Sequence, residues 1–299
     1  MISAGSANCI VDFSTEQLLL VSALVSFGDL PPDPTLGASV FYRSPVPCCP
    51  STEIMADQHP IHILGIRVDN VTCDEALARM EEFIADGRPH QVVTVNPEFI
   101  MTAQEDPCFA HILSQADLNL PDGQGLIWAA RLLGASLRER VTGVDTVLRL
   151  AELSAEKGYR LYLLGAAEGV AAAAARQLQV RFPGLEIAGT HAGSPLPEED
   201  ERVVNWIKRT NAQLLFVAFG APHQEEWIAR NLAHLGVPVA MGVGGAFDFV
   251  SGEAKRAPHW VQRMGLEWLH RLIYQPWRWR RMLALPRFVL LVLRERSGR

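Results

Sequence analysis

The sequence lacks the cysteine spacing of a zinc site, a long apolar run and any Asp-x-Asp triplet. Its five cysteines include no C-x-x-C pair and no nearby pair of histidines, which favours a reducing compartment over a structural zinc. No apolar run approaches the roughly 18 residues that a spanning helix needs, so we expect no transmembrane helix. Without an Asp-x-Asp triplet, a carboxylate-bound cation that bridges a nucleotide diphosphate is not encoded in the usual way. The sequence therefore predicts no metal site.

The composition is that of a folded globular protein. The chain has 299 residues, of which 48% are hydrophobic and 20% charged, and its formal net charge is −6. These values exclude a disordered chain, a collagen and a small disulfide-rich domain. The length suits one large or two small domains, and either can bury a sizeable core.

The first 54 residues differ from the rest of the sequence. They contain six of the nineteen prolines and show no clear hydrophobic period. No Lys or Arg precedes Leu18, so a secretory signal is not expected. We expect residues 1–54 to be disordered or loosely attached, as an extension that is not native to the domain. Met55 could be the natural start.

From Ile61 onwards, short apolar runs alternate with helical periods. Ile61–Val68 predicts a short strand or hairpin, and Thr72 can cap the first helix. The later expected strands are Gln91–Asn96, Leu118–Leu120, Arg160–Leu164, Leu185–Gly189, Gln213–Ala218 and Val237–Val243. The expected helices are Asp74–Ala85, one that begins at Pro97, Gly125–Leu133, Asp145–Lys157, Gly169–Phe182, Glu198–Arg209 and Gln224–Leu232. This alternation predicts an α/β fold: a Rossmann-like, mostly parallel sheet with helices on both faces, in a catalytic domain over residues 55–254.

Residues 255–299 form a distinct basic segment. They carry eleven Lys and Arg against two Glu, a net charge of +9, and four of the seven tryptophans. The pattern predicts two helices, His259–Tyr274 and Trp277–Arg296, with a kink at Pro286. Apolar stripes of this kind are usually part of a core, but here nearly all the polar positions are Arg. The pairing of Trp with Arg favours a helical appendage that associates with a membrane rich in anionic lipid. No nucleic-acid-binding module accompanies the charge, so we expect no nucleic-acid partner.

Polar or flexible residues follow four of the expected strands. Thr94 and Asn96 end the first strand of the alternation, and Asp122 follows the second. The loops Gly165–Gly169 and Gly220–Gln224 follow two later strands. Because the carboxyl ends of parallel strands lie at one edge of a sheet, we expect these four loops to converge on one cleft.

Asp122 is the most informative acid in these loops. It lies between Pro121 and Gly123, where a carboxylate could simply form a turn. Alternatively, a partly desolvated carboxylate in a cleft could act as a general base towards a hydroxyl nucleophile. Thr94 would then orient a sugar or phosphate oxygen, although threonine is also common in strands for its β-propensity.

The loop Gly165–Gly169 resembles a phosphate cradle at a helix N-terminus. It is not a G-x-G-x-x-G motif, and Glu168 would repel a phosphate, so a nicotinamide-dependent fold is disfavoured but stays open. The glycine-rich turn Gly242–Asp248 would allow backbone to approach a ligand or a helix closely. In the basic segment, Arg271, Arg278 and Arg281 could stabilise a diphosphate in place of a metal. They could instead only hold the segment on the acidic body or on lipid.

Seven blocks of sequence occur in order between Ile61 and Arg287. They are Thr94–Glu98, Asp122-Gly123, Thr142–Asp145, Gly220–Glu225, Gly242–Asp248, Arg256–Pro258 and Glu267–Leu272. Together, they closely resemble the WecG/TagA/CpsF family of bacterial glycosyltransferases. His223 departs from the family pattern, where Lys is common, and so does His270, where an aromatic residue is common.

The resemblance implies an inverting, metal-independent enzyme without a cofactor, on the inner face of the cell membrane. It would transfer a hexose, typically N-acetylmannosamine and in some members glucose, from a UDP-sugar to a polyprenyl-diphosphate-linked sugar in cell-surface polysaccharide or teichoic acid synthesis. By the same resemblance, Asp122 is the catalytic base and Thr94 and Gln224 are its companions. The expected substrate-binding residues are Asn96, Gly143, Asp145, Gly165, Gly220, Arg271, Arg278 and Arg281.

Two other classes of function remain open from the sequence. An NAD-dependent oxidoreductase would bind its cofactor at the loop Gly165–Gly169. A non-catalytic adaptor would bind lipid or nucleic acid through the basic segment and would show salt-sensitive association without turnover. Whether the chain forms a homo-oligomer also stays open.

Overall fold

The structure, a computed structural model, describes residues 59–254, 257–258, 261, 267–274 and 283–298. The expected extension 1–54 lies outside the described residues, as do Arg278 and Arg281. Within the described residues, no helix is both long enough and apolar enough to span a bilayer.

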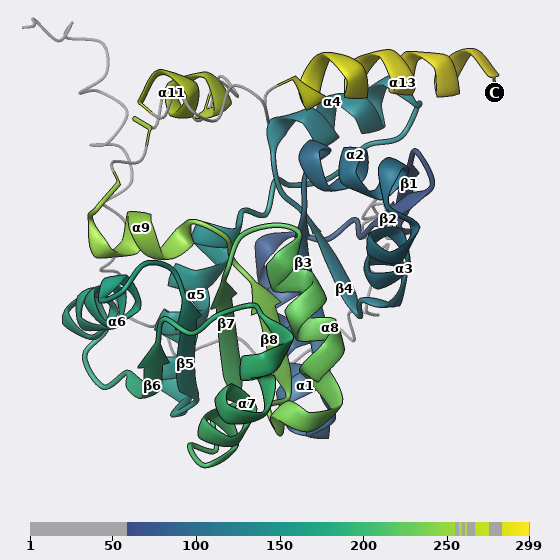
Figure 1. Ribbon diagram of the computed structural model, residues 1–299. Coiled ribbons are helices and arrows are strands. Elements are labelled where there is room, and N and C mark those ends of the chain that lie inside the picture. Colours follow the sequence, from purple (N-terminus) through teal and green to yellow (C-terminus); the bar gives the residue numbers. More distant parts are fainter. Residues whose placement is uncertain (1–58, 255–256, 259–260, 262–266, 275–282, 299) are drawn as a thin grey trace, which may run out of the picture. The chain divides into compact units, whose positions relative to one another are not determined.

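A six-stranded parallel sheet forms the centre of the fold (Figure 1). Its strands are β3 (His90–Val95), β4 (Leu118–Pro121), β5 (Arg160–Gly165), β6 (Glu186–His191), β7 (Leu214–Ala218) and β8 (Val239–Gly242). They lie in the order β4-β3-β8-β7-β5-β6. The expected α/β fold with a parallel sheet is confirmed, and all six expected strands are present with bounds shifted by at most two residues at either end.

Short strands β1 (Ile61–Ile63) and β2 (Ile66–Val68) form a separate antiparallel hairpin. Leu64 and Gly65 occupy the turn with φ of 50° and 80°, the left-handed region that a two-residue hairpin turn requires. The sequence left a strand and a hairpin open, and the structure has the hairpin. The Asp69 N–H donates to the Asn119 carbonyl at 2.9 Å and so connects the end of the hairpin to β4.

Most of the helices follow strands, as the alternation predicts. They are α1 (Cys73–Asp86), α2 (Pro97–Glu105), α3 (Pro107–Gln115), α4 (Gln124–Leu132), α5 (Gly143–Lys157), α6 (Val170–Arg181), α7 (Asp200–Lys208), α8 (His223–Leu235) and α9 (Ala246–Ser251). Thr72 caps α1 as expected, in a capping box with Glu75. The single helix expected at Pro97 is two helices, because Asp106 caps a new helix at Pro107 and proline cannot continue the preceding one.

Helices cover both faces of the sheet, as expected. Alternate side chains of each strand point to opposite faces, so Val92 packs in one core cluster and Val93 in another. Helices α1, α5, α6 and α9 pack on one face. On the other face, α7 and α8 cover the centre, whereas α2, α3, α4 and the hairpin cover the side of β3 and β4.

Two helices of the basic segment are described, α11 (Glu267–Tyr274) and α13 (Ala284–Gly298). Phe288 and Val292 of α13 are buried in the core cluster that α2 and α4 share. The first part of the expected helix Trp277–Arg296 lies outside the described residues, so the kink expected at Pro286 stays a prediction. Pro286 lies in the first turn of α13, where its missing N–H would have no intrahelical partner.

Candidate active site

Asp122 lies directly after β4, at the carboxyl edge of the sheet. Its N–H donates to the Val95 carbonyl at 2.8 Å, so the turn is fixed against the end of β3. The side chain is half-buried, and its Oδ2 accepts from the Gly143 N–H at 3.5 Å. Gly143 is the first residue of α5, so the positive end of that helix faces the carboxylate.

Thr94 lies beside Asp122 on the neighbouring strand. Its hydroxyl donates to the Gly242 carbonyl at 3.3 Å, and the side chain is buried. A Cβ atom placed on Gly143 would be 3.5 Å from Cγ2 of Thr94, so these two residues lie close together. Asp122, Gly143, Thr94 and Gly242 therefore form one continuous cluster across the ends of β4, β3 and β8.

Gln224, in the first turn of α8, joins two loops at the same edge. Its Oε1 accepts from the Gly220 N–H at 3.2 Å and from the Gly244 N–H at 2.9 Å. Its Nε2 donates to Oε1 of Glu225 at 2.7 Å. The Gln224 amide thus connects the loop after β7 to the turn after β8, and it brings the predicted residue Gly220 into the site.

Asn96 and Asp145 stabilise helix N-termini next to Asp122. The Asn96 Oδ1 accepts from the Phe99 N–H at 3.0 Å and caps α2. Thr142 caps α5, and its hydroxyl donates to Oδ2 of Asp145 at 2.6 Å. These contacts give both residues a local structural role, and their contact with substrate stays a prediction.

Gly165 lies at the end of β5, which β7 and β8 separate from Thr94 on β3. Its φ is +103°, and a Cβ atom there would lie 2.7 Å from the carbonyl carbon of Ala218. The glycine is therefore required for the close approach of β5 to β7. The structure does not bring it into contact with the Asp122 cluster, and its role in binding substrate stays a prediction.

Helix α11 is held at the rim of the site by an ion pair. Nη1 of Arg140 lies 3.2 Å from Oε2 of Glu267, and both side chains are largely buried. The next residue after Arg140, Val141, donates its N–H to the Pro121 carbonyl at 2.9 Å. Arg271 follows Glu267 by one helical turn, and its side chain lies outside the described part of the structure, as do Arg278 and Arg281.

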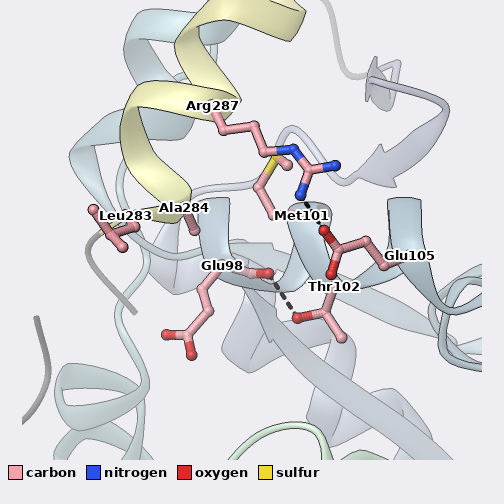
Figure 2. Close-up of a pocket in the computed structure, with 7 residues that line it drawn as sticks. All are labelled: Glu98, Met101, Thr102, Glu105, Leu283, Ala284 and Arg287. Carbon is pink, nitrogen blue, oxygen red and sulfur yellow. Dashed lines mark hydrogen bonds and ion pairs between the residues drawn. The ribbon is translucent and has the colours of Figure 1, made fainter. Parts of the chain in front are cut away.

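A groove of about 310 Å³ lies between α2 and the start of α13 (Figure 2). Its lining combines apolar side chains with charged ones: Glu98, Met101, Thr102, Glu105, Leu283, Ala284 and Arg287. Arg287 forms an ion pair with Glu105 across the groove. Pro97, the first residue of α2, lies close to the Asp122 loop, since a Cβ atom added to Gly123 would be 3.7 Å from its Cδ. The next residue, Glu98, lines the groove.

Glu225 is a buried acid of this site that was not predicted from the sequence. Its side chain is fully buried, and burial raises the pKa of the carboxyl from 4.5 to about 8. Gln224 and Glu225 share the buried side of α8 with Ile228, Asn231 and Leu235. Polar residues at the apolar positions of a helix were the sequence signal that could have revealed this pair.

Within the described residues, no three His, Cys, Asp or Glu side chains lie together as a metal-binding group.

A carboxylate, a threonine and two glycine-rich turns lie together at the carboxyl edge of an open parallel sheet. This arrangement is typical of an α/β enzyme that binds its ligand across the strand ends. The sequence of residues 61–299 matches the model of the glycosyl transferase WecG/TagA/CpsF family. The chain belongs to this family and is a glycosyltransferase. Family membership confirms the resemblance and sets aside the oxidoreductase and adaptor alternatives.

Curated relatives carry the same enzyme name. The N-acetylglucosaminyldiphosphoundecaprenol N-acetyl-beta-D-mannosaminyltransferase of Bacillus subtilis is 38% identical over 209 residues, which cover 70% of this chain and 80% of the relative. The enzyme of that name from Staphylococcus aureus is 32% identical over 241 residues, which cover 79% of this chain and 93% of the relative.

Proposed function

We propose that this protein transfers N-acetylmannosamine from a UDP-sugar to an N-acetylglucosamine that is linked to polyprenyl diphosphate, with inversion at the anomeric carbon. Family membership and the names of the relatives support the transferred sugar and the acceptor. The polysaccharide product would be a cell-surface polymer such as a teichoic acid.

The position of Asp122 carries this proposal. Asp122 is a half-buried carboxylate at the carboxyl edge whose Oδ2 accepts from the Gly143 N–H, and this position supports a role in acting on a bound hydroxyl. In the proposed step, Asp122 removes the proton from the acceptor hydroxyl. The acceptor oxygen then forms a bond to the anomeric carbon while the bond to the diphosphate oxygen breaks, and UDP leaves with the electron pair. One displacement of this kind inverts the anomeric configuration.

The departing diphosphate needs positive charge near it. Our proposal assigns this role to Arg271, Arg278 and Arg281, because guanidinium groups bind phosphate oxygens through paired hydrogen bonds. The Arg140–Glu267 ion pair supports the assignment, since it fixes α11, which contains Arg271, beside the segment that contacts Asp122. Arginines in this role would make the transfer independent of a metal ion.

The acceptor has a sugar, a charged diphosphate and a long apolar chain. The groove between α2 and α13 offers Met101, Leu283 and Ala284 as apolar groups. Its cation, Arg287, is paired with Glu105, and Glu98 adds a second negative charge, so the lining suits an apolar chain and not a diphosphate. We therefore assign to this groove only the part of the polyprenyl chain that follows the diphosphate.

The outer surface of α13 supports association with the membrane. Val289, Leu290 and Leu293 are 48%, 51% and 42% exposed and lie on one side of the helix, opposite the buried Phe288 and Val292. By helical geometry, Arg287 and Arg294 flank this apolar strip on one side and Arg296 on the other. An apolar strip of valine and leucine with arginines at its borders is suited to the interface of an anionic bilayer.

The proposal is tested by a screen of UDP-sugars against a polyprenyl-diphosphate N-acetylglucosamine acceptor, with the product read by mass. UDP-N-acetylmannosamine should give an acceptor heavier by one N-acetylhexosamine residue, and the product's anomeric configuration, read by NMR, should be opposite to the donor's. Transfer from UDP-glucose alone would assign the enzyme to the glucose-transferring members. No transfer from any donor would contradict the proposal.

A further inference from the structure

Glu225 and Gln224 form a buried hydrogen-bonded pair beneath the candidate site. Their side chains are 0% and 1% exposed, and Oε1 of Glu225 accepts from Nε2 of Gln224 at 2.7 Å. Oε2 of Glu225 has no hydrogen-bond partner among the described residues. An amide that donates through its nitrogen to Glu225 must present its oxygen to the opposite side. That side is where the N–H groups of Gly220 and Gly244 lie.

Gly242 provides the space for this pair. A Cβ atom on Gly242 would lie 2.3 Å from Oε1 of Glu225 and 2.7 Å from Nε2 of Gln224, closer than atoms can approach. The carbonyl of Gly242 accepts the hydroxyl of Thr94. A continuous series of contacts therefore runs from Glu225 through Gly242 to Thr94, and through Gln224 to the two glycine-rich turns.

We propose that Glu225 is a positioning residue: its carboxyl fixes the orientation of the Gln224 amide, and this amide holds the turns after β7 and β8 in the arrangement needed for transfer. Asn and Gln amides have two orientations of similar shape, and only their hydrogen-bond partners distinguish them. Without the acceptor on Glu225, the Gln224 amide could rotate, and Gly220 and Gly244 would lose a common acceptor.

The chemistry of the carboxyl fits this role. A fully buried carboxyl without a cation stays protonated more readily than one in water, and burial raises the pKa of Glu225 accordingly. A neutral carboxyl can accept from Gln224 through one oxygen without placing an isolated charge in the core. A glutamine at this position has the same shape and also offers a carbonyl oxygen, so it should replace glutamate in the positioning role.

The test compares Glu225→Ala and Glu225→Gln with the wild type, measuring kcat and KM for the UDP-sugar at a temperature at which all variants are folded. It rests on the proposed function, so the wild type is assayed first, and wild-type inactivity would count against the proposed function alone. Asn231→Ala is the matched control. Asn231 is also buried on α8, and its Nδ2 donates to the Trp227 carbonyl at 3.0 Å, two helical turns from Gln224.

Glu225→Ala should lower kcat by about tenfold or more, because small misplacements in a site reduce rates steeply. Glu225→Gln should restore kcat to within about threefold of the wild type. Asn231→Ala should lower the melting temperature but leave kcat nearly unchanged. The proposal is overturned if Glu225→Ala keeps the wild-type kcat, if Glu225→Gln is as impaired as Glu225→Ala, or if Asn231→Ala loses kcat to the same extent.

Discussion

Arg140 and Glu267 are 127 positions apart in the sequence, and their side chains meet at 3.2 Å in a largely buried ion pair. This pair joins helix α11 to the segment that runs from Arg140 to Gly143, whose last N–H donates to Asp122. The basic C-terminal segment is thereby connected to the carboxyl edge of the sheet. The position of α11 at the site thus depends on an ion pair whose two charges can be reversed singly or exchanged by mutation.

Reversing either charge alone should lower kcat/KM for the UDP-sugar. Arg140→Glu or Glu267→Arg places two like charges in a partly buried contact, and breaking a buried pair typically costs about 3–5 kcal/mol. We expect a loss of about tenfold or more in each single variant and recovery of most of it in the double charge swap. Steady-state kinetics of the four proteins measure the coupling.

Arg149→Glu is the control for this charge swap. Arg149 forms an exposed ion pair with Asp74, and its side chain is 50% exposed on α5. Exposed pairs contribute little, so activity should hardly change. Additive losses in the Arg140/Glu267 double variant would show that the pair does not position α11.

Protonation of Glu225 should make stability depend on pH. The folded protein keeps this proton up to about pH 8, whereas the unfolded chain releases it near the ordinary pKa of 4.5, and the neighbouring Glu226 adds a smaller effect in the same direction. The folded state therefore binds more protons between these values, and the stability from this group is lost as the pH rises towards 8.

Glu225→Gln does not carry this titration. As the pH rises from about 5 to about 8.5, the melting temperature of the wild type should fall relative to that of Glu225→Gln. Each kcal/mol of stability that the wild type loses should change this difference by roughly 2–4 °C. Thermal melts of both proteins across this range measure the difference. Parallel curves would show that Glu225 titrates normally in the folded state.

Charged substitutions on the outer side of α13 should weaken binding to vesicles. Leu290→Glu with Leu293→Glu removes two exposed apolar side chains and adds two negative charges, so affinity for phosphatidylglycerol vesicles should fall by about tenfold or more in a flotation assay. Val180→Glu is the control, because Val180 is 77% exposed on α6, whereas α13 packs on α2 and α4. Unchanged vesicle binding in the double variant would show that the outer side of α13 does not bind the membrane.

The alternation of strands and helices could be predicted from the sequence because each element has its own local pattern. The runs Val92-Val93 and Leu215–Ala218 place apolar side chains on both faces of the sheet, as is typical of strands buried between two helical layers. The break between α2 and α3 was missed, although Asp106-Pro107 is a typical helix start, because only the beginning of a helix at Pro97 was predicted. The order of strands depends on long-range packing and could not be obtained from local patterns.

The candidate site could be predicted only in part, because local patterns place residues at strand ends but do not show which residues they pack against. Strand-end rules placed Asp122, Thr94 and Gly220 at one edge, and the structure places them there. The rules gave no indication that Gly165 serves the packing of β5 on β7, because a glycine required for space looks the same in sequence as one that binds phosphate. The contact between Arg140 and Glu267 joins residues 127 positions apart, so it depends on the assembled fold and could not be predicted from local patterns.

The most direct test of the account is the rate of sugar transfer by Asp122→Asn, with and without a chelator. Asp106→Asn is the control, because Asp106 caps α3 and asparagine caps a helix equally well. If Asp122 is the base, Asp122→Asn should retain UDP-sugar binding by calorimetry and lose about 10²–10⁴-fold in kcat, while EDTA leaves wild-type and Asp106→Asn turnover unchanged. A wild-type rate in Asp122→Asn, or wild-type turnover that EDTA stops and a divalent cation restores, would contradict it.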